Sequence, residues 1–317
     1  MNPSTKSYAR SPFHFQGKLT DPNYFEGWYF KQVNRQRNQS ISFIFGISLN
    51  VERPQSFIQV IKTNPLVSYA FTYPLSDFRL QNEGYIIKES FFSQTEIDIR
   101  IDEPEFKCIG KLNFSKIIPL QNHSLYAPSI MGPFTYIPNM ECNHGVVNMR
   151  HRIDGTLTID GEVWEFVDDV GYIEKDWGRS FPKRYVWLQG NHFPETSANF
   201  MLSVADIPFH KLNFEGVIAH LDLGHKSYRF ATYYGAYKQS LSKIDNGFIL
   251  SIRQAFHTLI VEAKFDQRAS LKSPKDGNMT QTIKEGLGGT IKVTLKRMNR
   301  IIWSSVSEHC GIEIEGY

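Results

Sequence analysis

The sequence predicts an all-β protein, and three observations lead to that prediction. Aromatic residues make up 14% of the 317 residues, with 24 Phe, 15 Tyr and 5 Trp, and aromatic side chains favour strands. Apolar and polar residues alternate along much of the chain, whereas segments with a helical repeat are scarce. Tight-turn residues separate these segments about every 8–12 positions, a spacing typical of a β-sandwich or β-barrel.

The expected strands follow one another along the whole chain. An apolar segment at 40–48 ends before Arg53-Pro54, and a second segment, 56–61, is followed by the turn residues Thr63-Asn-Pro65. Asp160-Gly161 separates two further alternating segments and fits a type I′ hairpin turn. Other alternating segments lie at 96–101, 155–159, 163–166 and 290–295.

A faint internal repeat predicts two related halves. Trp28 and Trp187 each lie in an aromatic strand, and an apolar strand follows each of them at a similar distance. Coincidence is the alternative explanation. The segment Gly178-Arg-Ser-Phe-Pro182 has the composition of a linker. We therefore expect an N-terminal half at 1–180 and a C-terminal half at 181–317.

Composition and charge exclude several classes of protein. The formal net charge is only +3, which does not suggest a nucleic-acid-binding protein. No apolar run is long enough for a membrane-spanning helix, and the polar segment 1–10 lacks the apolar core of a secretory signal. The three cysteines are widely spaced and odd in number, which excludes a disulfide framework and a zinc ribbon. We therefore expect a cytoplasmic protein.

The familiar cofactor and nucleophile motifs are missing from the sequence. It has no phosphate-binding loop, no dinucleotide-binding glycine pattern between a strand and a helix, no nucleophile elbow and no zinc-protease motif. We therefore expect no cofactor. Three clusters remain in which carboxylates or histidine lie among aromatic residues.

The first cluster is Phe25-Glu-Gly-Trp-Tyr-Phe30. Side chains alternate along a strand, so Glu26 and Trp28 share one face. A glutamate among large aromatic rings would be desolvated, which would raise its pKa. The alternative is a glutamate at the start of a strand that accepts hydrogen bonds from backbone amides. We expect Glu26 and Trp28 to contact a substrate.

The second cluster is Met140-Glu-Cys-Asn-His-Gly145. Alternation places Glu141 and Asn143 on one face, and Cys142 and His144 on the other. His144 is a candidate general base or a residue that orients an acid; the alternative is a hydrogen-bonded core histidine. We expect Glu141 to contact a substrate. A metal site needs three or four converging ligands, and His144 with Cys142 supplies only two, so we expect no metal.

The third cluster, Val170-Gly-Tyr-Ile-Glu-Lys-Asp-Trp-Gly178, is the most informative. Alternation places Tyr172, Glu174 and Asp176 on one face and Trp177 on the other. If the first face is buried, the close like charges raise the pKa of one carboxyl, which becomes a proton donor at neutral pH. The alternative is a solvated strand face. We expect a buried site in which Asp176 and Trp177 contact the substrate.

These three clusters resemble recurring blocks of the tocopherol cyclase family. The similarity extends through Ser129-Ile-Met-Gly132, Trp187-Leu-Gln-Gly-Asn-His-Phe193 and Phe230-Ala-Thr-Tyr-Tyr-Gly-Ala236, and so covers nearly the whole chain. The block from Gly171 to Pro182 is the most specific. Plant members have Asn where this chain has Asp176, so the chain is more similar to the shorter bacterial members. The resemblance implies two lipocalin-like (calycin) antiparallel β-barrel halves with few helices, and kinship with carotenoid hydratases.

The resemblance also implies a reaction and the residues that carry it. Such enzymes protonate a prenyl C=C bond without a cofactor, and a phenol oxygen then closes a chroman ring. In the related hydratases a Tyr-x-acid pair and an upstream His act on the double bond, and the matching positions here are Tyr172, Glu174 and His144. Glu174 would be the acid, although the hydratases have Asp there, and Tyr172 and His144 a relay or base. Trp28 or Trp177 would face the cation.

Two other functions remain open from the sequence. One is a hydratase of an isoprenoid C=C bond, and the other is a lipocalin-like carrier that binds a hydrophobic small molecule without reacting. An enzyme must place a titratable acid in the pocket, whereas a carrier needs only apolar walls. In each case the partner is a hydrophobic small molecule, which suggests peripheral contact with a membrane, although no amphipathic anchor helix is apparent.

Overall fold

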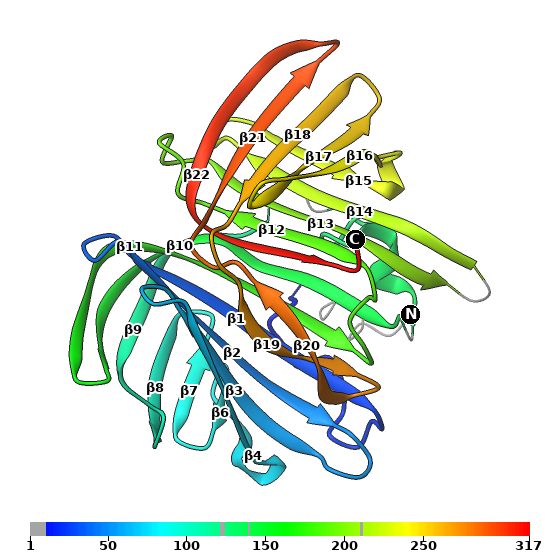
Figure 1. Ribbon diagram of the computed structural model, residues 1–317. Helices are drawn as coiled ribbons and strands as arrows, with labels where there is room; N and C mark the ends of the chain where they lie inside the picture. Colours follow the sequence, from blue (N-terminus) through cyan, green and yellow to red (C-terminus); the bar gives the residue numbers. More distant parts are fainter. Residues whose placement is uncertain (1–10, 121–123, 139, 210–211) are drawn as a thin grey trace.

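The structure is a computed structural model that describes residues 11–120, 124–138, 140–209 and 212–317 (Figure 1). The described residues form two large, curled antiparallel β-sheets, which confirms the predicted all-β fold class. The helices among them are short 3-10 turns: η1 (Leu75–Asp77), η2 (Gly132–Tyr136) and η3 (Thr232–Tyr234). The polar segment 1–10, in which we expected no secretory signal, lies outside the described residues. Within the described residues, no helix is long and apolar enough to span a membrane.

The first sheet is built from the N-terminal part of the chain. Its strand order is β4-β3-β2-β1-β11-β10-β9-β8-β7-β6-β5. The strands are β1 (Tyr24–Asn34), β2 (Gln39–Leu49), β3 (Gln55–Lys62), β4 (Val67–Pro74), β5 (Phe78–Gln81), β6 (Gly84–Ile87), β7 (Ser90–Ser93), β8 (Glu96–Glu103), β9 (Phe106–Ile118), β10 (Cys142–Ile159) and β11 (Glu162–Gly178). Asp160 and Gly161, both with positive φ, form the predicted hairpin turn between β10 and β11.

The second sheet is built from the C-terminal part of the chain. Its main path is β15-β14-β13-β12-β22-β21-β18-β17-β16, and β20 joins β22 at one end with β19 beside it. The strands are β12 (Tyr185–Gly190), β13 (Asn199–Phe209), β14 (Leu212–Asp222), β15 (Ser227–Ala231), β16 (Tyr237–Ile244), β17 (Gly247–Gln254), β18 (His257–Lys264), β19 (Ala269–Lys275), β20 (Asn278–Glu285), β21 (Gly289–Arg297) and β22 (Arg300–Glu315).

The two sheets share one pattern of connection. In the first sheet β1 pairs with its successor β2 and with the last strand, β11. In the second sheet β12 pairs with its successor β13 and with the last strand, β22. The aromatic strands containing Trp28 and Trp187 thus hold equivalent positions. The chain passes between the sheets after Gly178, and we keep 1–180 and 181–317 as the proposed division into halves.

Three apolar cores follow from this arrangement. One lies inside the curl of the first sheet and includes Trp28 and Phe30, and a second lies inside the curl of the second sheet. The third core lies between the sheets, because its members come from both of them: Tyr29 and Tyr172 from the first, Trp187 from the second. Strand β1 and the C-terminal half of β11 are therefore buried on both faces, which positions a site between the sheets.

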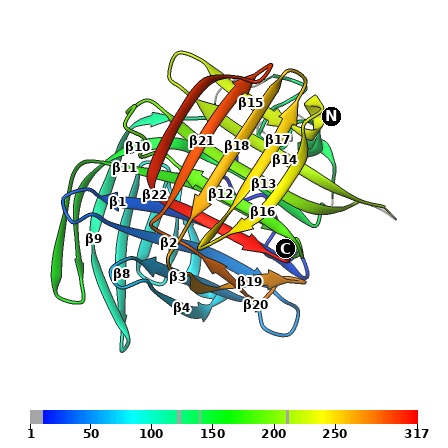
Figure 2. The same ribbon diagram turned by 45° about the horizontal axis from the view of Figure 1, so that its top comes forward.

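The hairpin of β19 and β20 crosses from the second sheet to the first. Figures 1 and 2 both show it beside β2 and β3. The side-chain amide of Gln59 on β3 donates to the carbonyl of Lys272 at 2.9 Å and accepts from the Lys272 amide at 2.7 Å. The Ser48 hydroxyl donates to the Gly277 carbonyl at 2.5 Å. These hydrogen bonds tie the two sheets together along one side of the space between them.

Candidate functional site

A pocket lies between the two sheets, next to the third core. Most of its lining is apolar and aromatic, and its acidic side chains and His144 lie on β10, β11 and β22. The hairpin of β19 and β20 supplies part of the wall. The lining includes Phe25, Tyr29, Ile44, Phe57, Met131, Phe134, Met140, Cys142, Asn143, His144, Glu174, Asp176, Phe181, Tyr185, Trp187, Ser203, Phe214, Tyr233, Leu271, Met279, Ile283 and Glu313. Apolar walls with a few converging polar groups are typical of small-molecule sites.

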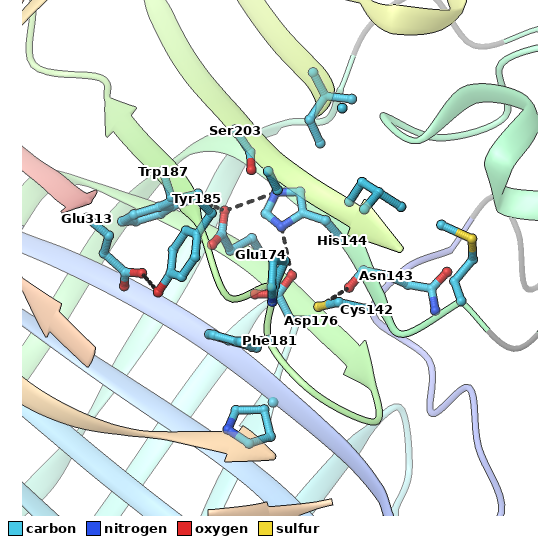
Figure 3. Close-up of a pocket in the computed structure, with 18 of the residues that line it drawn as sticks. Cys142, Asn143, His144, Glu174, Asp176, Phe181, Tyr185, Trp187, Ser203 and Glu313 are labelled. Carbon is cyan, nitrogen blue, oxygen red and sulfur yellow. Dashed lines mark hydrogen bonds and ion pairs between the residues drawn. The ribbon is translucent and has the colours of Figure 1, made fainter. Parts of the chain in front are cut away.

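His144, Glu174 and Asp176 come together in this pocket (Figure 3). Strands β10 and β11 pair so that His144 lies opposite Asp176, and the next inward position on β11 carries Glu174. His144 Nδ1 lies 2.7 Å from Asp176 Oδ1, and His144 Nε2 lies 3.5 Å from Glu174 Oε2. The second and third sequence clusters therefore form one site.

The two hydrogen bonds to the Glu174 carboxyl group are both accepted by the same oxygen, Oε2. The Tyr172 hydroxyl donates to Oε2 at 2.5 Å, and Trp187 Nε1 donates to the same oxygen at 3.1 Å. The residue is only 4% exposed. Burial raises the Glu174 pKa to about 7, against the lowering effect of His144 and of the two hydrogen bonds. With Oε2 occupied, Oε1 is the oxygen that can present a proton to the pocket.

The His144 ring lies between the carboxyl groups of Glu174 and Asp176. Burial by itself lowers the His144 pKa, but Glu174 and Asp176 raise it more, to about 9. The contact with Asp176 fixes the Nδ1 nitrogen as the donor, as a carboxylate partner does in His–Asp pairs generally. The Nε2 nitrogen is thereby directed towards Glu174.

Trp187 is a site residue that the sequence analysis did not assign. Its ring lies edge-on to Tyr29, with centroids 5.4 Å apart. A Cβ on Gly311 would lie 2.6 Å from the Trp187 ring, so glycine is required for the ring to approach β22. The resemblance marked the strand of Trp187, but only the fold shows that this ring reaches Glu174.

The sequence analysis also missed a second acidic group in the pocket. Glu313 on β22 lines the pocket and accepts a hydrogen bond from the Tyr185 hydroxyl at 2.6 Å. Behind it, Glu285 is fully buried and accepts from the Tyr29 hydroxyl at 2.7 Å. The alternation in Ile312-Glu-Ile-Glu315 resembles the row of acids on β11, and it is the signal that could have identified Glu313.

Glu26, Trp28 and Trp177 lie on the other face of their strands, away from this pocket. Glu26 forms an ion pair with Lys175 and accepts hydrogen bonds from the Gln16 amide at 3.0 and 3.1 Å. The Lys175 Nζ lies 5.1 Å from the Trp28 ring centroid and 4.8 Å from that of Trp177. The structure thus does not bring these three residues to this pocket. Trp28 belongs to the core of the first sheet.

Glu141 also lies outside the pocket lining. Its backbone carbonyl accepts hydrogen bonds from the amides of Arg179 at 2.7 Å and Ser180 at 3.2 Å. Gly178 has a φ of +146°. A Cβ at this position would lie 2.3 Å from the Glu141 carbonyl oxygen, so a side chain would not fit. The Glu141 backbone thus shapes the exit of β11, whereas its neighbours Cys142, Asn143 and His144 line the pocket.

The three polar residues on β10 and β11 also form a potential metal site. His144, Glu174 and Asp176 offer ligand atoms that all lie within 4.8 Å of one another. Imidazole and carboxylate donors suit Zn²⁺. From the sequence alone only Cys142 and His144 were counted as candidate metal ligands, because the pairing of β10 with β11 is a feature of the fold. A metal ion is therefore a competitor for the proton-donor role at this site.

Solved structures of other proteins share the fold. The crystal structure of CghA with Sch210972 matches with a TM-score of 0.58 and 12% identity, covering 93% of this chain and 89% of that chain. Kievitone hydratase from Nectria haematococca matches with a TM-score of 0.53 and 11% identity, covering 96% and 93%. At such low identity these matches establish the architecture of the chain alone.

Two kinds of sequence comparison identify relatives, and they match different lengths of this chain. Tocopherol cyclase, chloroplastic, from Zea mays is 41% identical over 51 residues, which are 16% of this chain and 11% of the maize protein. A probable tocopherol cyclase from Oryza sativa subsp. japonica is 39% identical over a segment of the same length. The aligned segment is thus a small part of these plant proteins. The family model described as tocopherol cyclase-like matches residues 82–316. This chain therefore belongs to the tocopherol cyclase-like family.

Proposed function

We propose that this protein closes a ring on a prenylated phenol by acid catalysis without a cofactor. The observation that carries the proposal is the Glu174 carboxyl group, which is buried at an aromatic pocket and held by Oε2 alone. Its pKa of about 7 keeps a large fraction protonated near neutral pH. A carboxylic acid kept neutral by burial is the proton donor that an alkene requires.

The proposed reaction transfers one proton and returns it. The Glu174 O–H bond breaks, and its proton adds to the less substituted carbon of the prenyl double bond as the π bond breaks. This leaves a tertiary carbocation and a Glu174 carboxylate. The phenol oxygen forms a C–O bond to the cation, its O–H bond breaks, and that proton returns to Glu174. Product and substrate are isomers, and no oxidant or reductant is consumed.

The neighbours of Glu174 have separate roles in this proposal. His144, which carries a proton and is paired with Asp176, stabilises the Glu174 carboxylate after the first step, because its Nε2 lies 3.5 Å away. Tyr172 is a positioning residue: it holds Oε2 but lies outside the pocket lining. From the sequence we expected Tyr172 and His144 to act as a relay or base. The pKa of each side chain is raised, which favours its protonated form.

The walls of the pocket support a cationic intermediate. The rings of Tyr29, Tyr185 and Trp187 line the same space as Glu174, and aromatic faces attract cations by their quadrupole. The remaining lining is mainly apolar, so few groups hold water that could capture the cation. These rings take the place that the sequence analysis had given to Trp28 and Trp177.

Hydration of an isoprenoid double bond is the second candidate. The polar side chains of Ser203 and Glu313 also line the pocket and can hold a water molecule. A water captured by the same cation would give an alcohol in place of a ring. A protein of the same fold carries the name kievitone hydratase, which supports keeping this candidate. A carrier of hydrophobic small molecules is the third.

Mass spectrometry of products formed in D₂O tests the three candidates together. The purified protein is incubated with a geranylated hydroquinone, with and without a chelator. Ring closure gives an isomer with one deuterium on carbon. Hydration also places one deuterium on carbon but adds a hydroxyl group from solvent, and a carrier gives unchanged substrate. We expect the deuterated isomer in both samples. Loss of product with the chelator, and its return with added Zn²⁺, would support a metal site in place of the proton donor.

The rate of the reaction should fall as pH rises through about 7. The donor is the protonated Glu174, whose pKa is raised to about 7, so above that value the active fraction falls about tenfold per pH unit. The Tyr172 hydrogen bond lowers the Glu174 pKa, so Tyr172→Phe should move the midpoint to higher pH. Profiles of kcat/KM between about pH 5 and 9 measure both effects. A rate that increases with pH would contradict the assignment.

The proposal extends to the location of the protein and its ligand. Cys108, Cys142 and Cys310 are all free thiols. Free thiols fit the cytoplasmic location that we propose, because reducing compartments keep cysteines unpaired. The ligand that we propose is a prenylated aromatic or a related isoprenoid.

A further inference from the structure

Two carboxyl groups lie opposite each other at the end of the pocket formed by β20 and β22. Glu285 and Glu313 are directly paired across these strands. Glu285 is fully buried and Glu313 is 8% exposed. Like charges directly opposite each other destabilise a sheet, and a buried charge without a partner is costly. At least one of the two carboxyl groups must therefore hold a proton.

The surroundings indicate that Glu313 is the protonated member of this pair. Burial and the charge of Glu174 raise the Glu285 pKa to about 7, against the lowering effect of the Tyr29 hydrogen bond and of the charge of Lys31. For Glu313, burial raises the pKa well above its usual range, and Glu285, Glu174 and Asp176 raise it further; only the Tyr185 hydrogen bond opposes them.

The Glu313 side chain is positioned to use that proton in the pocket. Tyr185 donates to Oε2 at 2.6 Å, and the rings of Tyr185 and Phe181, 6.1 Å apart at their centroids, both line the pocket. Figure 3 shows the Glu313 carboxyl group and the Tyr185 hydroxyl meeting beside Trp187. With Oε2 occupied by Tyr185, a proton on Oε1 is available to a ligand.

We infer that Glu313, oriented by Tyr185, is a second ligand-binding residue that donates a hydrogen bond to an oxygen atom of the bound molecule. Glu174 acts at the reacting double bond, whereas Glu313 recognises an oxygen elsewhere on the same ligand. A neutral carboxyl group in an apolar site is a strong donor to such an oxygen. This deepens the proposed function and rests on it for the identity of the ligand.

A binding experiment with unreactive probes tests the inference. Decylhydroquinone and ortho-decylphenol have the same saturated chain and differ by one hydroxyl group, and neither has a double bond to protonate. Isothermal titration calorimetry compares their affinities. We expect the wild-type protein to bind decylhydroquinone about tenfold more tightly, as one satisfied hydrogen bond in a buried site provides.

Three variants determine whether Glu313 causes this preference. Glu313→Gln keeps an acceptor for Tyr185 and an N–H donor for the ligand, so it should retain most of the preference. Glu313→Leu has neither and should bind both probes equally. Glu308→Gln, at an exposed position of the same strand, should match the wild type. If Glu313→Leu fails to fold, Tyr185→Phe, which keeps the ring, replaces it and should reduce the preference several-fold.

The outcomes separate this inference from the proposed reaction. No preference in the wild type overturns the inference, even if ring closure occurs. A preference that survives in folded Glu313→Leu, or that Glu313→Gln loses to the same extent as Glu313→Leu, also overturns it. A preference that depends on Glu313 in a protein without turnover supports the inference and contradicts the proposed function.

Discussion

Glu174→Gln should lower the rate of product formation by about 10²- to 10⁴-fold, the usual contribution of a positioned general acid. The substitution preserves the size of the side chain. Its amide oxygen can still accept from Tyr172 and Trp187, which both donate to Oε2 of the native carboxyl group. The amide has no acidic proton to give to an alkene. We therefore expect the fold and the ligand affinity to persist. Turnover should be lost, which product formation at saturating substrate measures.

Two matched variants serve as controls for the loss of turnover in Glu174→Gln. Glu165→Gln changes an exposed glutamate on the same strand, β11, and should leave the rate unchanged. Glu174→Asp keeps the acid but withdraws it by one methylene group, so a smaller loss is expected. Wild-type turnover in Glu174→Gln would remove Glu174 from the mechanism.

Lys175→Met should lower the free energy of unfolding by about 3–5 kcal/mol, because it leaves the Glu26 carboxylate buried without its partner. Lys175 and Glu26 both have fully buried side chains and form an ion pair in the core of the first sheet. The substitution also removes the cation that lies over the rings of Trp28 and Trp177. Urea unfolding followed by circular dichroism measures the change.

A double variant and a surface control complete the measurement. Glu26→Leu combined with Lys175→Met should recover much of the lost stability, because it removes both buried charges. Lys111→Met, which breaks an exposed ion pair with Glu96, should change stability little. If Lys175→Met instead kept its stability and lost ligand binding, the original expectation that Glu26 and Trp28 belong to the site would return.

Alternation in the sequence predicted which side chains share a face, but not which face meets the pocket. Tyr172, Glu174 and Asp176 do share one face of β11, and the Asp160-Gly161 turn is where it was expected. On β1 the same reasoning grouped Glu26 with Trp28, which lie on the face away from this pocket. Both faces of β1 are buried, so polarity gives no indication of which one a ligand contacts.

The remaining site residues depend on pairings between distant segments. Trp187 reaches Glu174 only because the second sheet packs on the first, and Glu313 enters the pocket only because β22 pairs with β12. Such contacts depend on tertiary packing, which a local pattern does not encode. The acidic row at Glu313 and Glu315 was visible in the sequence, but an acidic row on a strand is equally typical of a solvated face.

The pairing of β12 with β22 has a consequence for synthesis of the chain. A ribosome makes Tyr185 and Trp187 well before the neighbouring strand, which contains Gly311 and Glu313. Until then one edge of β12 has no partner, and an uncovered strand edge invites pairing with other chains. The edge of β12 is therefore covered only when β22 has been made, and products that are truncated before β22 should be the ones that aggregate.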